Sequence, residues 1–337
     1  MLVWGGSRLD PETLESVAMR DGAAYDPRSD TWRDIPDAPV PGGYGYSATW
    51  TGDEMIVWGD PDVGRKGDGN VGAAYDPETD SWRRIAPGPL SGRASHLAVW
   101  TGDELVIWGG YLTRFEREHY DGEGAAYNPD TDSWRRLADG PLPPGYDAMG
   151  AWTGDEVVVL VSPMGIEPED YPKFAHAAAY DPASDRWRKL PRPPFVTNVS
   201  PPAPYLDGHL FLLSLNGEVD GGEEDGFGRS YETGGIFDVG NERWLEHSDP
   251  PKVPNQTWPQ IALGDEVVID GLAYDPERDS WRALPDFPLK NREFPVTVWT
   301  GTELIVWGGA ASPTGNTIVD PPPPLNDGAA YTPPERP

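Results

Sequence analysis

Two arginines at equivalent points of a repeated sequence pattern could together bind an anion. Arg93 is followed three residues later by His96, and Arg292 by Pro295, each just before a strand-like run. A guanidinium is a planar fork of donors that matches a carboxylate or a phosphate. If both side chains face one cavity, they could hold such a group of a small ligand. The alternative is that both arginines pair with carboxylates of the chain's own loops.

Other polar and aromatic residues share these positions. Asn198 and Asn255 align with the two arginines, Tyr46 and Trp258 align with His96, and further candidates lie in or beside long connecting segments. The predicted ligand-binding residues are Arg93, Arg292, Asn198, Asn255, Tyr46, His96, Trp258, Arg114, His119 and His176.

Acid–base catalysis is the other chemistry to weigh, because a proton-transfer enzyme needs an acid and a base within reach of its substrate. His119, His176, Glu116 and Glu118 could supply such groups, but no two of them stand at a motif spacing. The chain has no Ser-His-Asp pattern and no phosphate-binding loop. No catalytic residue is therefore assigned, and a binding protein is favoured over an enzyme.

An acidic segment could bind calcium, which prefers oxygen ligands. It contains Glu218, Asp220, Glu223, Glu224 and Asp225, without the Asp-x-Asp-x-Asp-Gly spacing of known calcium loops. The favoured interpretation is a solvated acidic loop, so no cofactor and no metal site is predicted, and calcium stays the alternative.

Composition limits the partners. The formal net charge is -30, so the field of the protein repels nucleic acid and anionic lipid. The 337 residues contain no cysteine, which excludes disulfides and thiolate chemistry. The longest apolar run, residues 157–161, is far too short to span a membrane. We expect a monomeric protein with a protein or glycan ligand, without nucleic-acid partners and without a transmembrane segment.

One sequence pattern recurs along the chain and indicates which elements position these residues. An aromatic residue before a turn returns seven times, at gaps of 50, 52, 53, 57, 37 and 57 residues. After the first six, a tryptophan follows at an offset of seven. The pairs are Tyr25 and Trp32, Tyr75 and Trp82, Tyr127 and Trp134, Tyr180 and Trp187, Phe237 and Trp244, and Tyr274 and Trp281, with Tyr331 as the seventh aromatic. The period is typical of a four-stranded propeller blade.

Four strand-like runs recur in each period. They are a run that ends before TGDE, an apolar run closed by glycine such as LVIWGG, the AAYDP run, and a run that starts at the tryptophan. Short β-rich runs bounded by Gly, Pro and Asp indicate antiparallel strands with tight turns. Asp76-Pro77 predicts a side-chain-capped turn, and Asn128 can replace the aspartate there. Fourteen of the 15 tryptophans fall on three repeat positions and are assigned to packing between blades, with Trp258 as the exception.

A double glycine closing an apolar strand, then a tyrosine, then a tryptophan resembles the kelch repeat, whose family fold is a β-propeller. The resemblance covers essentially the whole chain, although LVSP at 160–163, LLSL at 212–215 and VVIDG at 267–271 depart from it. The kelch-like propellers include galactose oxidase and a sialic acid epimerase. The copper radical site of the former needs a cysteine, so that activity is excluded.

The strand count predicts an all-β, seven-bladed kelch-type propeller of four-stranded blades, with one strand lacking from each of the first and last blades. A six-bladed ring is the alternative. The whole chain, 1–337, is expected to be one domain. Its approximate blades are 1–40, 41–90, 91–143, 144–194, 195–250, 251–288 and 289–337.

The beginning of the chain aligns with the interior of a repeat, since MLVWGG matches MIVWGD at residues 55–60. We hypothesise that Met1 is an internal methionine and that the two lacking strands lie upstream of it. An export signal in such a segment would favour an extracytoplasmic location, and its absence a cytoplasmic one, so the location is left open.

The connections between strands predict where a ligand binds. The TGDE and DPETD turns share one end of the blades and are short and uniform, whereas the second-to-third and fourth-to-first connections at the other end are long and individual. Binding residues are usually carried by variable loops on a rigid scaffold. The predicted function is a non-catalytic propeller that recognises a protein or glycan at the long-loop end. The alternative is a carbohydrate-active enzyme, such as a sialic-acid-type epimerase or a lyase.

Overall fold

The described part of the chain is built from β-strands. The computed structural model describes residues 1–9, 16–43, 45–60, 70–114, 117–120, 122–163, 176–193, 203–213, 234–251, 260–269, 271–285, 289, 292–293, 295–311 and 325–333. No helix occurs in these ranges, and hence none that could span a membrane.

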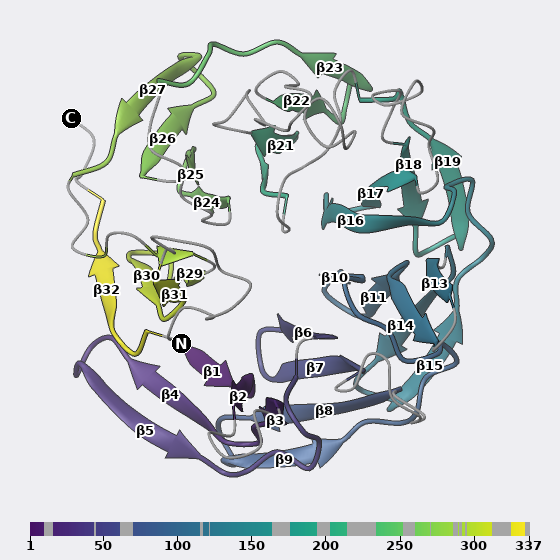
Figure 1. Cartoon of the computed structure of the whole chain (residues 1–337). Coiled ribbons are helices and arrows are strands. Elements are labelled where there is room, and N and C mark those ends of the chain that lie inside the picture. Colours follow the sequence, from purple (N-terminus) through teal and green to yellow (C-terminus); the bar gives the residue numbers. More distant parts are fainter. Residues whose placement is uncertain are drawn as a thin grey trace. The chain divides into compact units, whose positions relative to one another are not determined.

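The strands belong to two compact units, of which the first comprises residues 1–165 and 176–190. It contains four main antiparallel sheets whose strands follow one another in chain order (Figure 1). These sheets are β1 (Leu2–Trp4), β4 (Gly22–Asp26) and β5 (Thr31–Ile35); β6 (Gly45–Trp50), β7 (Met55–Asp60), β8 (Val71–Asp76) and β9 (Ser81–Arg84); β10 (Leu97–Trp100), β11 (Leu105–Trp108), β14 (Gly124–Asn128) and β15 (Ser133–Arg136); and β16 (Gly145–Trp152), β17 (Val157–Pro163), β18 (His176–Asp181) and β19 (Arg186–Lys189).

The second unit comprises residues 166–175 and 191–337. Its three main sheets have the same antiparallel order. They are β20 (Tyr205–Leu206), β21 (His209–Leu213), β22 (Gly234–Asp238) and β23 (Arg243–Leu245); β24 (Ile261–Leu263), β25 (Glu266–Ile269), β26 (Leu272–Asp275) and β27 (Ser280–Ala283); and β29 (Val296–Trp299), β30 (Leu304–Trp307) and β32 (Gly328–Tyr331).

These seven sheets are the blades of an all-β propeller, four in the first unit and three in the second. Five blades have four strands, and within the described residues the first and last blades have three each, which gives 26 blade strands. The predicted seven-bladed all-β fold is confirmed, and the six-bladed alternative is wrong. The expected single domain and its blade boundaries stay predictions.

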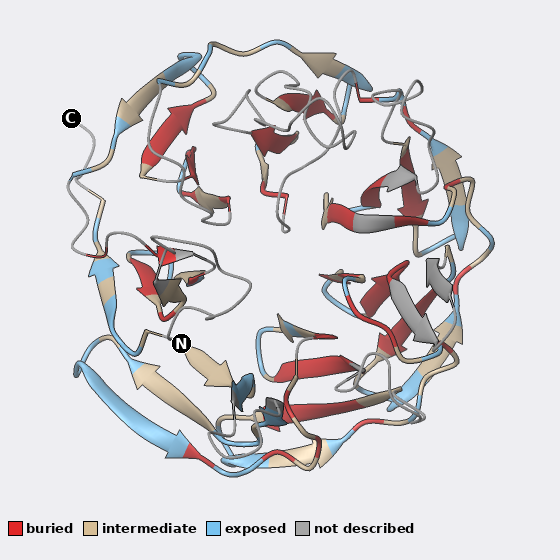
Figure 2. Ribbon diagram, viewed as in Figure 1, coloured by how far each residue is buried: buried red, intermediate tan, exposed pale blue. Residues whose placement is uncertain are grey.

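The middle strands of each blade are apolar on both faces because a neighbouring blade can cover each face. All four residues of β11, LVIW, are buried, whereas β9 and β15 at the outer edges have exposed ends. Figure 2 shows this change from buried to exposed between β8 and β9. One core cluster joins Val106 and Trp108 of the third blade to Val157 and Tyr180 of the fourth. The core of the first unit therefore lies between sheets, which is how blades pack.

The repeated tryptophans connect successive blades, as predicted. The Trp134 ring packs against Tyr127 of its own blade at 5.1 Å and against Trp58 of the preceding blade at 5.7 Å. Its indole Nε1 donates to the Ala86 carbonyl, 2.8 Å away, at the end of the preceding blade's outer strand. Each such tryptophan thus contributes both apolar contact and a directed hydrogen bond.

The turn chemistry is also confirmed. The Asp76 carboxylate accepts a 2.8 Å hydrogen bond from the Glu78 amide, and in the third blade the Asn128 side chain accepts one from the Thr131 amide. An aspartate ends this turn in five blades and adopts a left-handed backbone, with φ of 50° at Asp80, whereas Glu242 takes this place in the fifth blade. Asp and Asn tolerate this conformation better than most other residues.

Several long connections contain strands that the sequence did not predict. In the first unit, β2 (Ser7–Leu9) pairs with β3 (Ser16–Ala18) between β1 and β4, and β12 (Tyr111–Arg114) pairs with β13 (Arg117–Tyr120) between β11 and β14. In the second unit, β28 (Arg292–Glu293) pairs with β31 (Ala310–Ala311). The first two pairs are hairpins within the connection between a blade's second and third strands, whereas β28 precedes the first strand of the seventh blade and pairs with β31, which follows that blade's second strand.

Candidate binding sites

Arg93 is built into the first unit just before β10. Its side chain is completely buried, at 0% exposed. Its Nη1 donates to the Gly109 carbonyl at 3.0 Å, and its Nε donates to the Ser91 carbonyl at 3.0 Å. The neighbouring Gly110 has φ of +105°, and a Cβ there would lie 2.8 Å from the Ala94 carbonyl oxygen and 3.2 Å from Arg93 Cδ. The double glycine therefore lets the turn close tightly over the arginine.

Arg292 occupies the corresponding place in the second unit. It is 3% exposed, and its Nη1 donates to the Gly308 carbonyl at 2.7 Å, sixteen residues away, as Arg93 does to Gly109. Its Nη2 also pairs with the Asp327 carboxylate at 2.9 Å. The predicted register is thus confirmed, and the predicted pairing with a loop carboxylate applies to Arg292. Anion binding by the two arginines together stays a prediction.

His96 and Tyr46 also occupy equivalent places. The ring of His96 meets Trp58 edge-on at 4.9 Å, and the ring of Tyr46 meets Trp4 edge-on at 5.4 Å. Each tryptophan ends the second strand of the preceding blade, as the repeat predicts. The two candidate residues are therefore part of the packing between blades on their inner strands.

The chemistry at His96 is that of a neutral imidazole. Burial, with a smaller contribution from the nearby Arg93 charge, lowers the pKa of His96 to about 3. Its Nε2 lies 2.8 Å from the Ser47 hydroxyl, so the pair forms a hydrogen bond between adjacent blades. Its Nδ1 is buried, and no hydrogen bond to a described side chain orients it. A neutral histidine with a serine can bind a polar ligand group, but no described carboxylate accepts a hydrogen bond from Nδ1, as a catalytic triad would require.

The remaining predicted residues have fewer described features. His176 begins β18 opposite Val161 and is half-buried. Arg114 ends β12, and His119 and Glu118 lie in β13, for which the backbone alone is described. Outside the described residues lie Asn198, Asn255, Trp258, Glu116 and the acidic loop of Glu218, Asp220, Glu223, Glu224 and Asp225. Within the described ranges, no three His, Asp or Glu side chains are grouped to hold a metal ion.

The end with the short turns carries a charged network that repeats from blade to blade. In the third blade, Arg135 pairs with Glu104 of its own TGDE turn, and its Nη1 donates to the Tyr180 hydroxyl of the next blade at 2.8 Å. The Tyr180 hydroxyl donates to the Asp185 carboxylate at 2.7 Å. That carboxylate also accepts a 3.0 Å hydrogen bond from the Ala138 amide. One blade is thus tied to the next through side chains of four residue types.

The pKa values in this network shift in the directions that its geometry requires. Burial raises the pKa of Tyr180 to about 12, so its hydroxyl stays protonated and can donate. The Ala138 amide and the Tyr180 hydroxyl lower the pKa of Asp185. The Glu104 carboxylate raises the pKa of Arg135. The charges of the network therefore persist throughout the physiological range.

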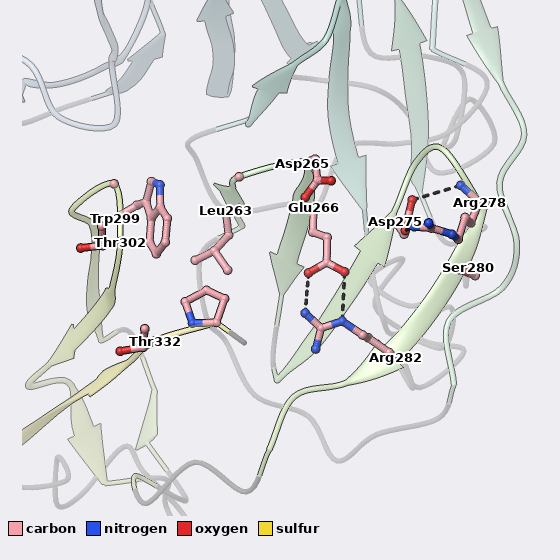
Figure 3. Close-up of a pocket in the computed structure, with 13 residues that line it drawn as sticks. Leu263, Asp265, Glu266, Asp275, Arg278, Ser280, Arg282, Trp299, Thr302 and Thr332 are labelled. Carbon is pink, nitrogen blue, oxygen red and sulfur yellow. Dashed lines mark hydrogen bonds and ion pairs between the residues drawn. The ribbon is translucent and has the colours of Figure 1, made fainter. Parts of the chain in front are cut away.

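A pocket of about 710 Å³ opens at the short-turn end of the second unit, between the sixth and seventh blades (Figure 3). The sequence does not predict this pocket, because the repeated turns at this end are short and uniform. Its lining includes Leu263, Glu266, Arg282, Trp299 and Thr332. The Arg282 guanidinium pairs with Glu266, through Nε at 2.9 Å, as Figure 3 shows.

Comparison with other proteins adds no closer assignment. The chain matches no model of a known protein family and no curated protein sequence. The fold and the packing of its repeats define it as a seven-bladed β-propeller.

Proposed function

We propose that this chain is a non-catalytic, kelch-type binding propeller that recognises a protein or glycan ligand at the end of the blades opposite the TGDE turns. One observation carries the proposal. In the first unit, the second-to-third strand connections contain the paired strands β2–β3 and β12–β13, which have no counterpart in the repeat.

The β2–β3 hairpin presents side chains that a partner could contact. Ser7, Arg8 and Ala18 are exposed, and Val17 keeps 38% of its surface exposed although it is apolar. An ordered hairpin loses less conformational entropy on binding than a flexible loop of the same length. Individual hairpins on repeated blades therefore combine a rigid scaffold with a specific surface.

The predicted ligand-binding residues stay part of the proposal, separately for each unit. In the first unit they are Arg93, Tyr46 and His96 on or before inner strands, with Arg114, His119 and His176 on or beside the long connections, and in the second unit Arg292 is the corresponding candidate. Because Arg93 and Arg292 are held by carbonyls of the chain, they would act from fixed positions. A fixed donor gains specificity because little side-chain entropy is lost when the ligand arrives.

The test removes one hairpin and keeps the blade. Residues 7–18 are replaced by Asn-Gly, which suits the two-residue turn between Gly6 and Met19, since the Met19 amide already donates to the Gly6 carbonyl at 3.0 Å. Wild-type and variant chains are compared on an array of sialylated and uronic-acid glycans and on a panel of purified proteins. We expect saturable binding without turnover, and a loss of roughly tenfold or more in affinity for the hairpin variant.

The control places a change at the opposite end. Asp53→Asn in an exposed turn position should leave both binding and melting temperature unchanged. Equal binding by the wild-type and hairpin-less chains would remove the hairpin from the site. Turnover of any arrayed sugar would contradict the non-catalytic assignment.

A further inference from the structure

The β12–β13 hairpin of the third blade places two arginines at directly opposed positions. Its cross-strand pairs are Tyr111 with Tyr120, Leu112 with His119, Thr113 with Glu118, and Arg114 with Arg117. Successive residues of a β-strand lie on opposite faces. Arg114, Arg117 and His119 therefore share one face of the hairpin, whereas Glu118 lies on the other face.

A pair of like charges at opposed positions is a cost to a hairpin unless something neutralises it. Opposed residues of antiparallel strands have Cα atoms about 4.5–5.5 Å apart, and like charges placed there destabilise the pairing. An anion bound between Arg114 and Arg117 would turn this repulsion into attraction, because a guanidinium is a planar fork of donors that matches a carboxylate. The register therefore gives this face of the hairpin the composition of an anion site.

The base of this hairpin is fixed to the core of the third blade. The Gly109 amide donates to the Glu123 carbonyl at 3.0 Å, and the Gly109 carbonyl accepts a 3.0 Å hydrogen bond from Nη1 of the buried Arg93. A Cβ at Gly110 would lie 3.2 Å from Arg93 Cδ, so the chain lies closely over that side chain. The opposed arginine pair is three residues beyond the first pair of the hairpin, about 10 Å along the strands. Arg93 is thus a positioning residue for the hairpin.

The charge of the hairpins is opposite to that of the chain and limits the charge of the ligand. The paired strands of β2–β3 and β12–β13 contain three arginines and one glutamate, whereas the whole chain has 26 basic and 56 acidic residues. At physiological salt, charges are screened over about 8 Å, so the nearest arginines govern the binding of one carboxylate. A polyanion would extend beyond them into the negative field of the chain. The hairpin therefore favours a ligand with a single negative charge.

We propose that the face of the β12–β13 hairpin that carries Arg114, Arg117 and His119 binds the single carboxylate of an acidic sugar. The two arginines bind the carboxylate, and His119 supplies a hydrogen bond to a neighbouring hydroxyl. An acidic sugar is the ligand class because it combines one carboxylate with several hydroxyls. This inference rests on the proposed function, since it names the chemistry of a ligand at the end opposite the TGDE turns.

The first experiment compares probes that differ in charge on the whole chain. Glucuronate and its neutral amide, glucuronamide, are titrated into the protein and followed by isothermal titration calorimetry. We expect saturable binding of glucuronate, roughly tenfold or more tighter than that of glucuronamide, because only the carboxylate makes charge-assisted hydrogen bonds. Equal binding of the two sugars, or no binding of glucuronate, would overturn the proposal. Tighter binding of glucose 6-phosphate or of a tetraglutamate peptide would overturn the assignment to a single carboxylate.

Two single variants test the arginine pair. Arg114→Gln and Arg117→Gln should each weaken glucuronate binding by roughly fivefold or more. The matched control is Arg28→Gln, which removes the same charge from an exposed turn at the opposite end of the blades and should leave binding unchanged. Without ligand, neither hairpin variant should melt below this control, because each removes one of two opposed like charges. A lower melting temperature would show that the arginine is paired within the chain, which would overturn the proposal.

A charge reversal tests the site by a gain of binding. The double variant Arg114→Glu with Arg117→Glu keeps two opposed like charges but changes their sign. It should lose glucuronate and bind the cationic sugar glucosamine, which the wild-type chain should not bind. A folded double variant that still binds glucuronate, or that does not gain glucosamine, would overturn the proposal.

Failure of this inference can be told from failure of the proposed function. If glucuronate does not bind but a neutral glycan or a protein does, and that binding is lost with residues 7–18, the ligand end stands and the carboxylate site is wrong. If glucuronate binding is lost in Arg28→Gln and kept in both hairpin variants, the ligand binds at the opposite end and both proposals are wrong.

Discussion

At the scale of single residues, residues that recur from blade to blade have different roles from residues that differ between blades. Asp185, Tyr180 and Arg135 recur in other blades and tie one blade to the next. Arg93 and His96 are individual, yet both are also engaged with neighbouring groups, namely the Gly109 carbonyl and the Ser47 hydroxyl. Residue type alone therefore does not separate binding residues from structural ones here, and the partners of each side chain must be known.

Replacing Asp185 by Asn should destabilise the first unit in a pH-dependent way. The folded state lowers the pKa of Asp185, so its ionised form stabilises the fold above its unfolded-state pKa, about 4, and this stabilisation is lost as the pH falls through the folded-state value. We expect Asp185→Asn to cost about 1 kcal/mol of unfolding free energy at pH 7. The difference from wild type should vanish towards pH 2, as measured by urea unfolding.

The control for this prediction is Asp207→Asn. Asp207 has the same left-handed backbone, with φ of 46° against 52° at Asp185, but lies exposed beside the β20–β21 turn. The same substitution there should change stability little at any pH. A pH-independent loss at Asp185 would mean that backbone preference, not the carboxylate, is responsible.

At the scale of elements, the joint between adjacent blades carries much of the stabilisation. A β-sheet edge could in principle be left to solvent, but the outer strand β15 is held to the preceding blade by an indole hydrogen bond and by a tilted contact between the Trp134 and Trp58 rings. Gly88 allows this packing, because a Cβ there would come within 3.1 Å of the Trp134 ring. Gly88 and the Trp134 ring are therefore complementary in size where these two blades pack together.

Trp134→Phe tests the directed part of that joint. Phenylalanine keeps most of the ring contact with Tyr127 and Trp58 but cannot donate to the Ala86 carbonyl, so we expect a loss of about 1–2 kcal/mol. The matched control is Trp50→Phe, since Trp50 is 50% exposed on β6 and should tolerate the change. Urea unfolding followed by far-UV circular dichroism measures both. Equal losses in the two variants would contradict the assigned role of the indole hydrogen bond.

At the scale of the whole molecule, charge is the dominant global property. The chain carries 56 acidic and 26 basic residues, and several of the arginines are already engaged in the joints. The unpaired excess is negative and repels itself, which opposes the compact state. Salt reduces this repulsion, since charges are screened over about 10 Å at 0.1 M.

We therefore expect sodium chloride to stabilise the protein at neutral pH. The melting temperature should rise by several degrees, roughly 3–6 °C, between about 10 mM and 0.5 M salt, because repulsion summed over the surface outweighs the screened ion pairs. The control is the same titration near the sequence isoelectric point of about 4.3, where the salt effect should nearly vanish. A melting temperature that falls with salt at pH 7 would show that the ion pairs dominate instead.

The sequence by itself determined the blades, their number and their turns. The pattern of Tyr127, the Asn128 turn and Trp134 recurs at constant offsets in other blades. A local pattern repeated at a constant period predicts the same strand, turn and strand each time. The alignment of the repeats predicts that Arg93 and Arg292 occupy equivalent positions in their blades, and that Tyr46 and His96 do so too. Their equivalent contacts confirm this.

Only the tertiary structure decided which groups those residues meet. The β2–β3 hairpin, the carbonyl partners of Arg93 and the pocket beside Arg282 could not be derived from the sequence. The physical reason is distance along the chain. The hydrogen bonds that join one blade to the next mostly link residues about 45 to 50 positions apart, so their presence or absence depends on the neighbouring blade and not on the local pattern.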